Sequence, residues 1–309
     1  MDKIFTVAKV VAPIFVSIFL GMYAKRKKLL TQEGIAGMQQ FVMNFGLPCV
    51  VFSSLLKAEL GAEALTSMGL VLPLMLLGTF WAFRARKNKF PYHNFPQLFA
   101  AQETGMLGIP LFMILFGADQ AYRMGVLDLA QAPAAFPVIA LLSAKATEST
   151  NPAAVVKRVL TSPLLVMCAL ALSLNLSGIG AWMDAVGIGG VITECTGFLG
   201  TPVSAMMIFS VGYNFSLEKG SRSTIFKISA IHFVMQAVFC VIIQLLLFLL
   251  PSVDMLTRWA ILMYCTLPAS YVAPSLGRSQ EDYTVASGVC SVLTVVSLVI
   301  FCGIAAVVA

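Results

Sequence analysis

The sequence predicts an all-α integral membrane protein with ten transmembrane helices, arranged as two inverted repeats of five, and three observations lead to this prediction. The 309 residues are 59% hydrophobic and only 11% charged, whereas about 25% of the residues in an ordinary soluble domain are charged. Apolar segments close to the ~20 residues that cross a hydrocarbon core follow one another along the whole chain. The fourth and ninth of these segments are interrupted at corresponding places.

Ten apolar segments can be placed between short polar connections. In chain order they cover about 4–24, 32–56, 64–83, 95–117, 121–143, 160–176, 191–215, 225–250, 256–277 and 283–308. The first segment begins directly after Asp2 and Lys3 and carries no small-residue cleavage site. We therefore expect a retained helix rather than a signal peptide.

The basic residues predict the orientation of these segments. If the cluster at 25–28 is cytoplasmic and the chain alternates, the inner connections hold four Lys or Arg at 25–28, four at 84–89, three at 145–158, three at 219–227, and Arg278. The outer side holds Lys3, Lys9, Lys57, Arg123 and Arg258. An excess of 15 to 5 is a strong positive-inside signal, so both termini are expected outside. Topology then accounts for the net charge of +6, and no nucleic-acid partner is expected.

The prolines suggest an internal repeat. Matching pairs at offsets of 150, 154 and 164 residues are Pro13 with Pro163, Pro48 with Pro202, and Pro110 with Pro274. Because each half has an odd number of segments, the second half would cross the membrane in the opposite direction, which is a common plan of secondary transporters. We expect a first repeat at 1–145, a cytoplasmic linker at 146–159 and a second repeat at 160–309.

The two interruptions are the strongest pointers to a binding site. The stretch from Gln102 to Pro110 holds Glu103, two glycines and a proline, and the stretch from Leu267 to Pro274 holds two prolines. Unwound backbone at membrane depth must face protein or a water-filled cavity. We expect 103–110 and 267–274 to be non-helical and to lie against each other near mid-membrane. The expected helix breaks are at Pro48, Pro110, Pro202, Pro268 and Pro274.

Several of these strings resemble the auxin efflux carrier family, which includes plant auxin exporters and bacterial organic-acid carriers. The matching strings are Asn44 to Pro48, Thr104 to Leu111, Ser162 to Leu165, Pro202 to Phe215, and Leu267 to Ala269. The chain has no long cytoplasmic loop, so it resembles the compact bacterial form of the inner membrane. The resemblance implies that segments four and nine cross at mid-membrane. It also implies a scaffold from 1–58 and 160–218, which often forms a homodimer, and a moving transport domain from 60–145 and 224–309.

The expected substrate-binding residues come from the two interruptions and from the second segment. They are Asn44, Gln102, Glu103, Thr104, Gly105, Gly108, Pro110, Pro268, Ala269, Ser270 and Tyr271. Two of them differ from the pattern of the family, which commonly has asparagine where Glu103 stands and a few residues after Pro268, in the region of Tyr271.

Glu103 and Asp128 are the candidate sites for a coupling ion. Glu103 is either a structural carboxylate that accepts hydrogen bonds at the helix break, or a carrier of H⁺ or Na⁺ whose charge responds to the substrate. Asp128 lies inside the fifth segment and is either structural, for example as a partner of Arg123, or part of the coupling. Asn44 either contacts substrate or caps a helix break, and Tyr271 either closes the pocket or packs at the crossing.

The expected function is secondary active transport of a small organic anion, a mono- or dicarboxylate, by elevator-type alternating access. No Lys or Arg lies near the middle of a segment, so an anion would meet the N-termini of half-helices. The alternatives are a sodium-coupled carrier like the bile-acid symporters, which would need two polar sodium sites, and a membrane sensor that transports nothing. An enzyme is not expected, because paired aspartates, a Ser-His pair and an H-E-x-x-H motif are absent. The seven scattered cysteines predict neither disulfides nor a metal site, and no cofactor is expected.

The orientation can be tested by labelling single cysteines in a cysteine-free background. Cysteines at Lys27, Lys87 and Ser221 should react with a membrane-impermeant reagent only from the cytoplasmic side, and cysteines at both termini only from outside. A C-terminus that reacts from the cytoplasm would contradict both the ten-segment topology and the inverted repeat.

Overall fold

The computed structural model describes residues 2–58, 62–144, 157, 161–215, 222–249 and 253–308. This described part is 85% helix and contains no strand. Its elements are α1 (Asp2–Lys27), α2 (Gln32–Phe41), η1 (Val42–Gly46), α3 (Leu47–Leu56), α4 (Ala62–Asn88), α5 (Gln97–Ala100), η2 (Thr104–Gly108), α6 (Ile109–Phe116), η3 (Ala118–Gln120), α7 (Ala121–Ala144), α9 (Pro163–Leu176), α10 (Ile179–Ala185), α11 (Ile188–Gly200), α12 (Val203–Asn214), α13 (Arg222–Phe248), α14 (Met255–Thr266), η4 (Ala273–Leu276) and α15 (Gln280–Val308).

Five helical stretches of the described chain are long and apolar enough to cross a membrane. They cover 32–56, 64–88, 188–214, 222–248 and 280–308. A sixth is formed by α9 and α10 if these two helices, which meet at an angle of 77°, count as one broken span. The all-helical fold with several apolar helices is therefore confirmed, whereas the ten-helix inverted repeat stays a prediction. Nearly all of the expected linker at 146–159 lies outside the described residues.

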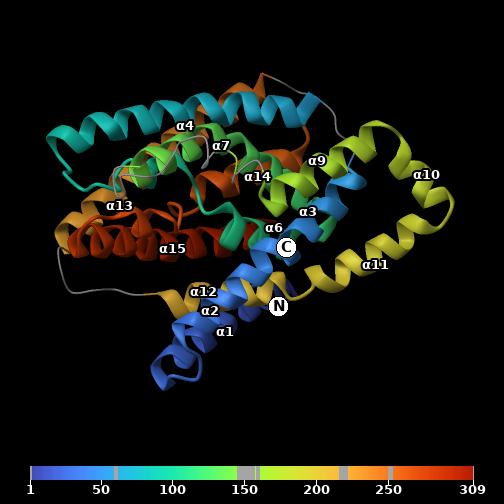
Figure 1. Ribbon diagram of the computed structural model, residues 1–309, viewed down its shortest axis with the longest axis horizontal. Coiled ribbons are helices and arrows are strands. Elements are labelled where there is room, and N and C mark those ends of the chain that lie inside the picture. Colours follow the sequence, from blue (N-terminus) through green and yellow to red (C-terminus); the bar gives the residue numbers. More distant parts are fainter. Residues whose placement is uncertain are drawn as a thin grey trace.

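The helices gather into two groups (Figure 1). In one group α1 packs against α12, and α3 packs against α9 and α11; in the other, α4 packs against α7, and α13 packs against α14 and α15. Gly21 and Gly212 show why α1 and α12 lie so close. A Cβ atom at Gly21 would lie only 2.1 Å from the Phe209 carbonyl oxygen, and one at Gly212 only 2.2 Å from that of Ile18. Small residues that let backbones touch are typical of helix contacts in membranes.

Pro48 does not break its helix, contrary to the expectation from sequence. The chain runs on from α2 through the π-helical η1 into α3, where Pro48 occupies the first turn. A π-helical turn changes the hydrogen-bond pattern just before the proline, which has no N–H to donate. Gly108, Ile109 and Pro110 repeat this arrangement, with π-helical η2 leading into α6. At Pro202, by contrast, a two-residue turn separates α11 from α12.

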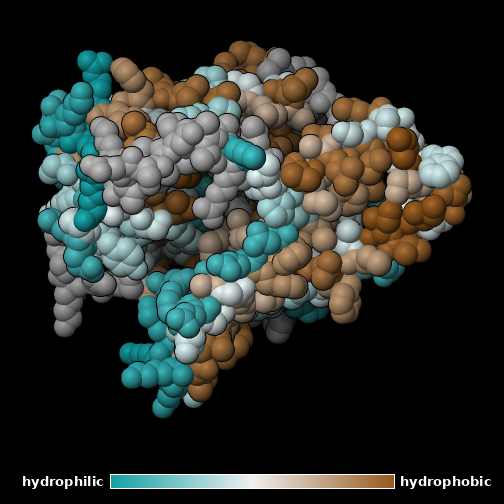
Figure 2. All heavy atoms as spheres, in the orientation of Figure 1, coloured by the Kyte–Doolittle hydropathy of each residue, from teal (hydrophilic) through white to brown (hydrophobic). Residues whose placement is uncertain are grey.

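The connection between the sixth and seventh expected segments contains a helix that the sequence did not predict. α10 begins after Gly178 and ends before Gly187, both of which adopt positive φ angles of 76° and 84°. Helices α9 to α11 project from the body of the fold, and their surface is largely apolar in Figure 2. Trp182 is 59% exposed and Phe198 is 83% exposed, as expected of side chains that meet lipid or another subunit.

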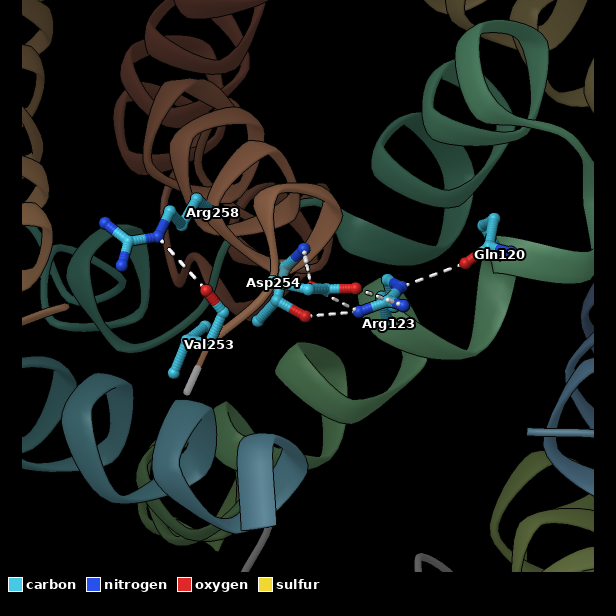
Figure 3. Close-up of polar contacts among 6 residues, drawn as sticks. Gln120, Arg123, Val253, Asp254 and Arg258 are labelled. Atoms are coloured by element: carbon cyan, nitrogen blue, oxygen red, sulfur yellow. Dashed lines mark hydrogen bonds and ion pairs between the residues drawn. The ribbon is translucent and has the colours of Figure 1, made fainter. Parts of the chain in front are cut away.

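An ion pair joins α7 to the start of α14 (Figure 3). The Nη2 of Arg123 lies 2.7 Å from Oδ2 of Asp254, and its Nη1 donates to Oδ1 at 2.8 Å. Asp254 is also the N-cap of α14, because its side chain accepts from the Thr257 backbone N–H at 2.8 Å. Arg258 donates to the carbonyls of Val253 and Leu247, at 3.3 and 2.7 Å, and so contributes a positive charge to the last turn of α13. Arg123 therefore pairs with Asp254, and not with Asp128.

Asp254 should stabilise the fold through both its charge and its cap. Asp254→Asn keeps the cap and loses the ion pair, at a cost of about 0–1 kcal/mol. Asp254→Ala loses both, and the missing cap should cost about 1 kcal/mol more. The order of thermal unfolding temperatures in detergent, measured by circular dichroism, should be wild type, then asparagine, then alanine. Asp119→Asn, an exposed site with the same charge change, should match the wild type.

The advantage of wild type over Asp254→Asn should depend on pH. Partial burial by itself raises the pKa of Asp254, but hydrogen bonds from Thr257 and the charge of Arg123 outweigh it and hold the pKa below its usual value. A depressed pKa contributes stability above the ordinary pKa of about 3.9, and this stability is lost as the pH falls through the lowered value. A difference between the two proteins that stayed constant down to the most acidic pH would contradict this role.

Candidate functional site

The two interrupted stretches meet as a short pair of extended segments. Gln102 and Ala269 form an isolated antiparallel bridge. On either side of it, Glu103 N–H donates to the Pro268 carbonyl at 2.9 Å, and Ser270 N–H donates to the Ala101 carbonyl at 3.1 Å. The unwound segment of the fourth stretch is therefore 101–103 and not 103–110, since the chain is helical from Thr104 to Phe116. We call this paired region, 101–103 with 268–270, the crossing.

Gln131 completes the hydrogen bonds of the crossing. Because the bonds of the bridge fall on its neighbours, the N–H and C=O of Gln102 point away from Ala269 and need other partners. The Oε1 of Gln131 accepts from the Gln102 N–H at 2.7 Å, and its Nε2 donates to the Gln102 C=O at 3.1 Å. Tyr264 holds this amide by donating its hydroxyl to Oε1 at 2.9 Å. The side-chain amide of Gln131 thus makes the two hydrogen bonds that a neighbouring extended backbone would otherwise make with Gln102.

The carboxylate of Glu103 joins both halves of the crossing. Its Oε1 accepts from the N–H of Met106, at the start of the half-helix 104–116, at 3.3 Å. Its Oε2 accepts from the N–H of Tyr271 at 2.6 Å. Glu103 is only 8% exposed. A helix N-terminus with free N–H groups is a natural binding place for an anion, and here a side chain of the protein itself occupies it.

Asp128 lies next to this carboxylate region. Its Oδ1 accepts from the Thr104 hydroxyl and, at 2.9 Å, from Nε2 of Gln131. On the other side of the crossing, the Tyr271 hydroxyl lies 2.7 Å from the Thr294 hydroxyl. Two acidic side chains and a set of neutral polar groups therefore surround the paired segments.

A cavity of about 800 Å³ lies beside the crossing. Its lining comes partly from α2, η1, α9 and α12, and partly from α7, α15 and the crossing. The cavity extends to Lys25 and Gln32, where α1 ends and α2 begins. Gln97 also lines it; this side chain is fully buried, and both of its amide atoms are without a hydrogen-bond partner in the described part of the chain.

The cavity brings together only part of the expected binding residues. Those that line it are Asn44, Gln102, Glu103, Thr104, Gly105, Ser270 and Tyr271, and Asp128 lines it as well. Gly108, Pro110, Pro268 and Ala269 do not belong to its lining. Gly108 instead makes room for the other stretch, because a Cβ atom there would lie 2.6 Å from Cδ1 of Leu267.

The described residues contain no group of three or more His, Cys, Asp and Glu that could hold a metal ion. The side chains of the crossing are instead held by amides and hydroxyls. With its amide oriented so that both atoms are satisfied, Gln102 donates to the carbonyls of Leu267 and Pro268, at 3.0 and 3.2 Å, and accepts from Gln236. Three glutamines, 102, 131 and 236, therefore pack around the unwound backbone.

Comparison with known families agrees with this geometry. The family model described as a membrane transport protein, the domain of the auxin efflux carriers, matches residues 6–142. The match covers 137 of the 309 residues, somewhat less than half of the chain, so over 6–142 this chain is similar to the auxin efflux carriers. Proteins of that family are membrane transporters. No curated protein sequence matches the chain significantly.

The polar residues of the site that the sequence did not single out include Gln131, Tyr264 and Gln97. A signal for Gln131 was present, because Asp128 and Gln131 are three residues apart and so lie on one face of an otherwise apolar helix. Tyr264 carries no such signal, since its partner Gln131 is 133 residues away in the chain, and the amide of Gln97 has no partner in the described residues that a pattern could indicate.

Gln131→Leu should destabilise the crossing more than an ordinary polar substitution. It leaves the N–H and C=O of Gln102 without partners in a buried site, at about 1–3 kcal/mol for each group. The unfolding temperature in detergent and substrate binding should both fall. The matched control is Gln39→Leu in α2, which also lines the cavity; if both variants lose the same stability, Gln131 does not support the crossing.

Proposed function

We propose that this protein is a secondary active transporter of a small organic anion, a mono- or dicarboxylate, coupled to H⁺ or Na⁺. The observation that carries the proposal is the position of Glu103, whose carboxylate accepts N–H groups from both halves of the crossing beside a cavity of about 800 Å³. A carboxylate of the substrate would suit the same N–H groups, since helix N-termini bind anions. Asn44, Thr104, Ser270 and Tyr271 would contact the rest of the substrate.

Coupling would follow from competition between two carboxylates. Ionised Glu103 occupies the N–H groups of Met106 and Tyr271 and repels an anion, and Asp128 adds to this repulsion. A protonated Glu103 is a weaker acceptor and carries no charge, so it would leave these N–H groups to the substrate. Substrate and proton would then each strengthen the binding of the other. A sodium ion beside the two acidic groups would have the same electrostatic effect.

The proposed transport cycle is an elevator. The scaffold at 1–58 and 160–218 would stay fixed as a homodimer, and the exposed apolar side chains of α10 and α11 suit such a contact. The transport domain at 60–145 and 224–309 would carry the crossing across the membrane. With both termini outside, the cavity that extends to Lys25 and Gln32 would give access from the cytoplasm of a bacterial cell.

A cationic substrate is the second candidate, because both acidic side chains near the crossing line the cavity. Among the described residues that line the cavity, Lys25 is the only Lys or Arg. Uptake of labelled mono- and dicarboxylates into proteoliposomes, beside a matched set of small organic amines, separates the two candidates. Uptake of amines without uptake of carboxylates would mean that the transported substrate is a cation and not an anion.

Glu103→Gln should separate binding from coupling, since glutamine imitates the neutral carboxyl group in size. With an inward gradient of one pH unit and one proton per anion, the wild type should accumulate substrate about tenfold. The variant should exchange internal for external substrate but accumulate none. If coupling is to sodium, the same difference should appear with a sodium gradient.

The matched control is Glu194→Gln, which removes an exposed carboxylate of α11 and should behave like the wild type. A Glu103→Gln variant that still concentrated substrate, with unchanged pH and sodium dependence, would make Glu103 a structural residue. The coupling site would then lie elsewhere.

A further inference from the structure

A second hollow lies outside the transport cavity, between α4 and α13. It has a volume of about 620 Å³, and all of its lining residues are apolar. Those that shape it are Leu77, Gly78, Trp81, Val234, Met235 and Phe239. Gly78 opens it, because a Cβ atom there would lie 3.0 Å from Cε of Met235 and 3.4 Å from the ring of Phe239.

The hollow faces outward at membrane depth. Both α4 and α13 belong to the stretches long and apolar enough to span a membrane. Leu77 is 57% exposed and Val234 is 59% exposed, so the walls continue into the surface that lipid covers. A purely apolar groove in this position suits a hydrocarbon chain, and it offers nothing for a polar ligand to bind.

Two cations lie at one end of the groove. Arg84 follows Trp81 by three residues on α4, and Lys227 precedes Ala230 by three on α13. Each is therefore about 4.5 Å beyond the groove along its helix. Aromatic contacts show that the cation of α13 lies beside the end of α4, because Nζ of Lys227 is 5.7 Å from the ring centre of Phe90. Arg84 lies seven residues after Leu77 and so on the same face of α4 as this groove residue, and its guanidinium lies 5.4 Å from the ring centre of Phe80 on the same helix.

A chain of rings links this charged end to the groove. Phe90 stacks on Phe95 with ring centres 4.9 Å apart, and Phe95 lies 6.2 Å from Trp81, which lines the groove. An apolar groove that ends at exposed cations matches the shape of one molecule, a lipid with an acyl chain and an anionic head group. Basic pockets between transmembrane helices bind such head groups.

We propose that the groove between α4 and α13 is a binding site for an anionic phospholipid. One acyl chain lies along Gly78, and the phosphate lies between Arg84 and Lys227. The site is on the surface of the expected transport domain and shares no lining residue with the transport cavity, so it does not depend on which substrate the protein carries.

Trp81 reports directly on occupancy of this groove. In a Trp182→Phe/Trp259→Phe background it is the only tryptophan, and its fluorescence is quenched by bromine atoms on a neighbouring acyl chain. The protein is reconstituted in phosphatidylcholine vesicles with a small fraction of brominated phosphatidylglycerol or of brominated phosphatidylcholine. The anionic lipid should quench Trp81 at the lower mole fraction.

Neutralising the cations should remove this preference. Each of Arg84→Gln and Lys227→Gln should lower the selectivity for the anionic lipid about fivefold, and both sites are exposed, so the fold should tolerate the changes. Gly78→Leu should reduce quenching by both lipids, because it fills the groove. The matched control is Lys27→Gln/Lys28→Gln, which removes the same charge from the end of α1 and should leave the selectivity unchanged.

Equal quenching by the two lipids in the single-tryptophan protein, with Arg84 and Lys227 unchanged, would overturn the proposal. So would a loss of selectivity in the control as large as in the Arg84/Lys227 double variant, since the preference would then come from the net charge of the protein. Substrate uptake is measured separately, so a failure of the proposed transport would not be mistaken for a failure of this site.

Discussion

The backbone of the crossing must be hydrogen-bonded without water, and the rest of the site depends on this constraint. Residues 101–103 and 268–270 are extended in the middle of a helical protein, where each unpaired N–H or C=O would cost several kcal/mol in lipid. They pair with each other, and the groups that this pairing leaves over are met by side chains. Gln131 takes both groups of Gln102, and the Cys290 thiol approaches the Ala269 carbonyl at 3.6 Å.

The same constraint explains why the acidic groups lie where they do. An unwound segment leaves the N–H groups of the next helical turn free, and the Glu103 carboxylate accepts one of them from Met106 and another from Tyr271. A group that holds the crossing together is thus also the group whose charge a substrate would meet. A structural role and a coupling role for Glu103 are therefore compatible. Protonation of its carboxyl group would change both the hydrogen bonds that hold the crossing together and the electrostatic potential in the cavity.

The sequence was sufficient to predict the helical fold and the two segments that meet at the crossing, whereas the role of Glu103 in binding or coupling stays a prediction. These predictions rest on local chemistry: apolar length, prolines, and a carboxylate inside an apolar segment. The predicted position of the unwound backbone, 103–110, lies too far along the chain, because Pro110 itself was expected to be the break. Pro110 instead follows a π-helical turn, and the chain is extended at 101–103 because Pro268 and Ser270 supply the partners. Gln131 and Tyr264 act through contacts 29 and 133 residues apart, which no local pattern contains.

The polar contacts at the start of α14 differ in kind from those at the crossing. Near the start of α14, Arg123 and Asp254 form a charged pair that is partly exposed, with exposed fractions of 12% and 37%. At the crossing, the described side chains use amides, hydroxyls and two carboxylates, without a Lys or Arg among their hydrogen-bond partners. Opposite charges in the low-dielectric middle would attract strongly and fix the crossing in one state. Neutral amides form the hydrogen bonds that the backbone needs without fixing the crossing in one state. They leave the acidic groups as the part of the site whose charge can change with the substrate.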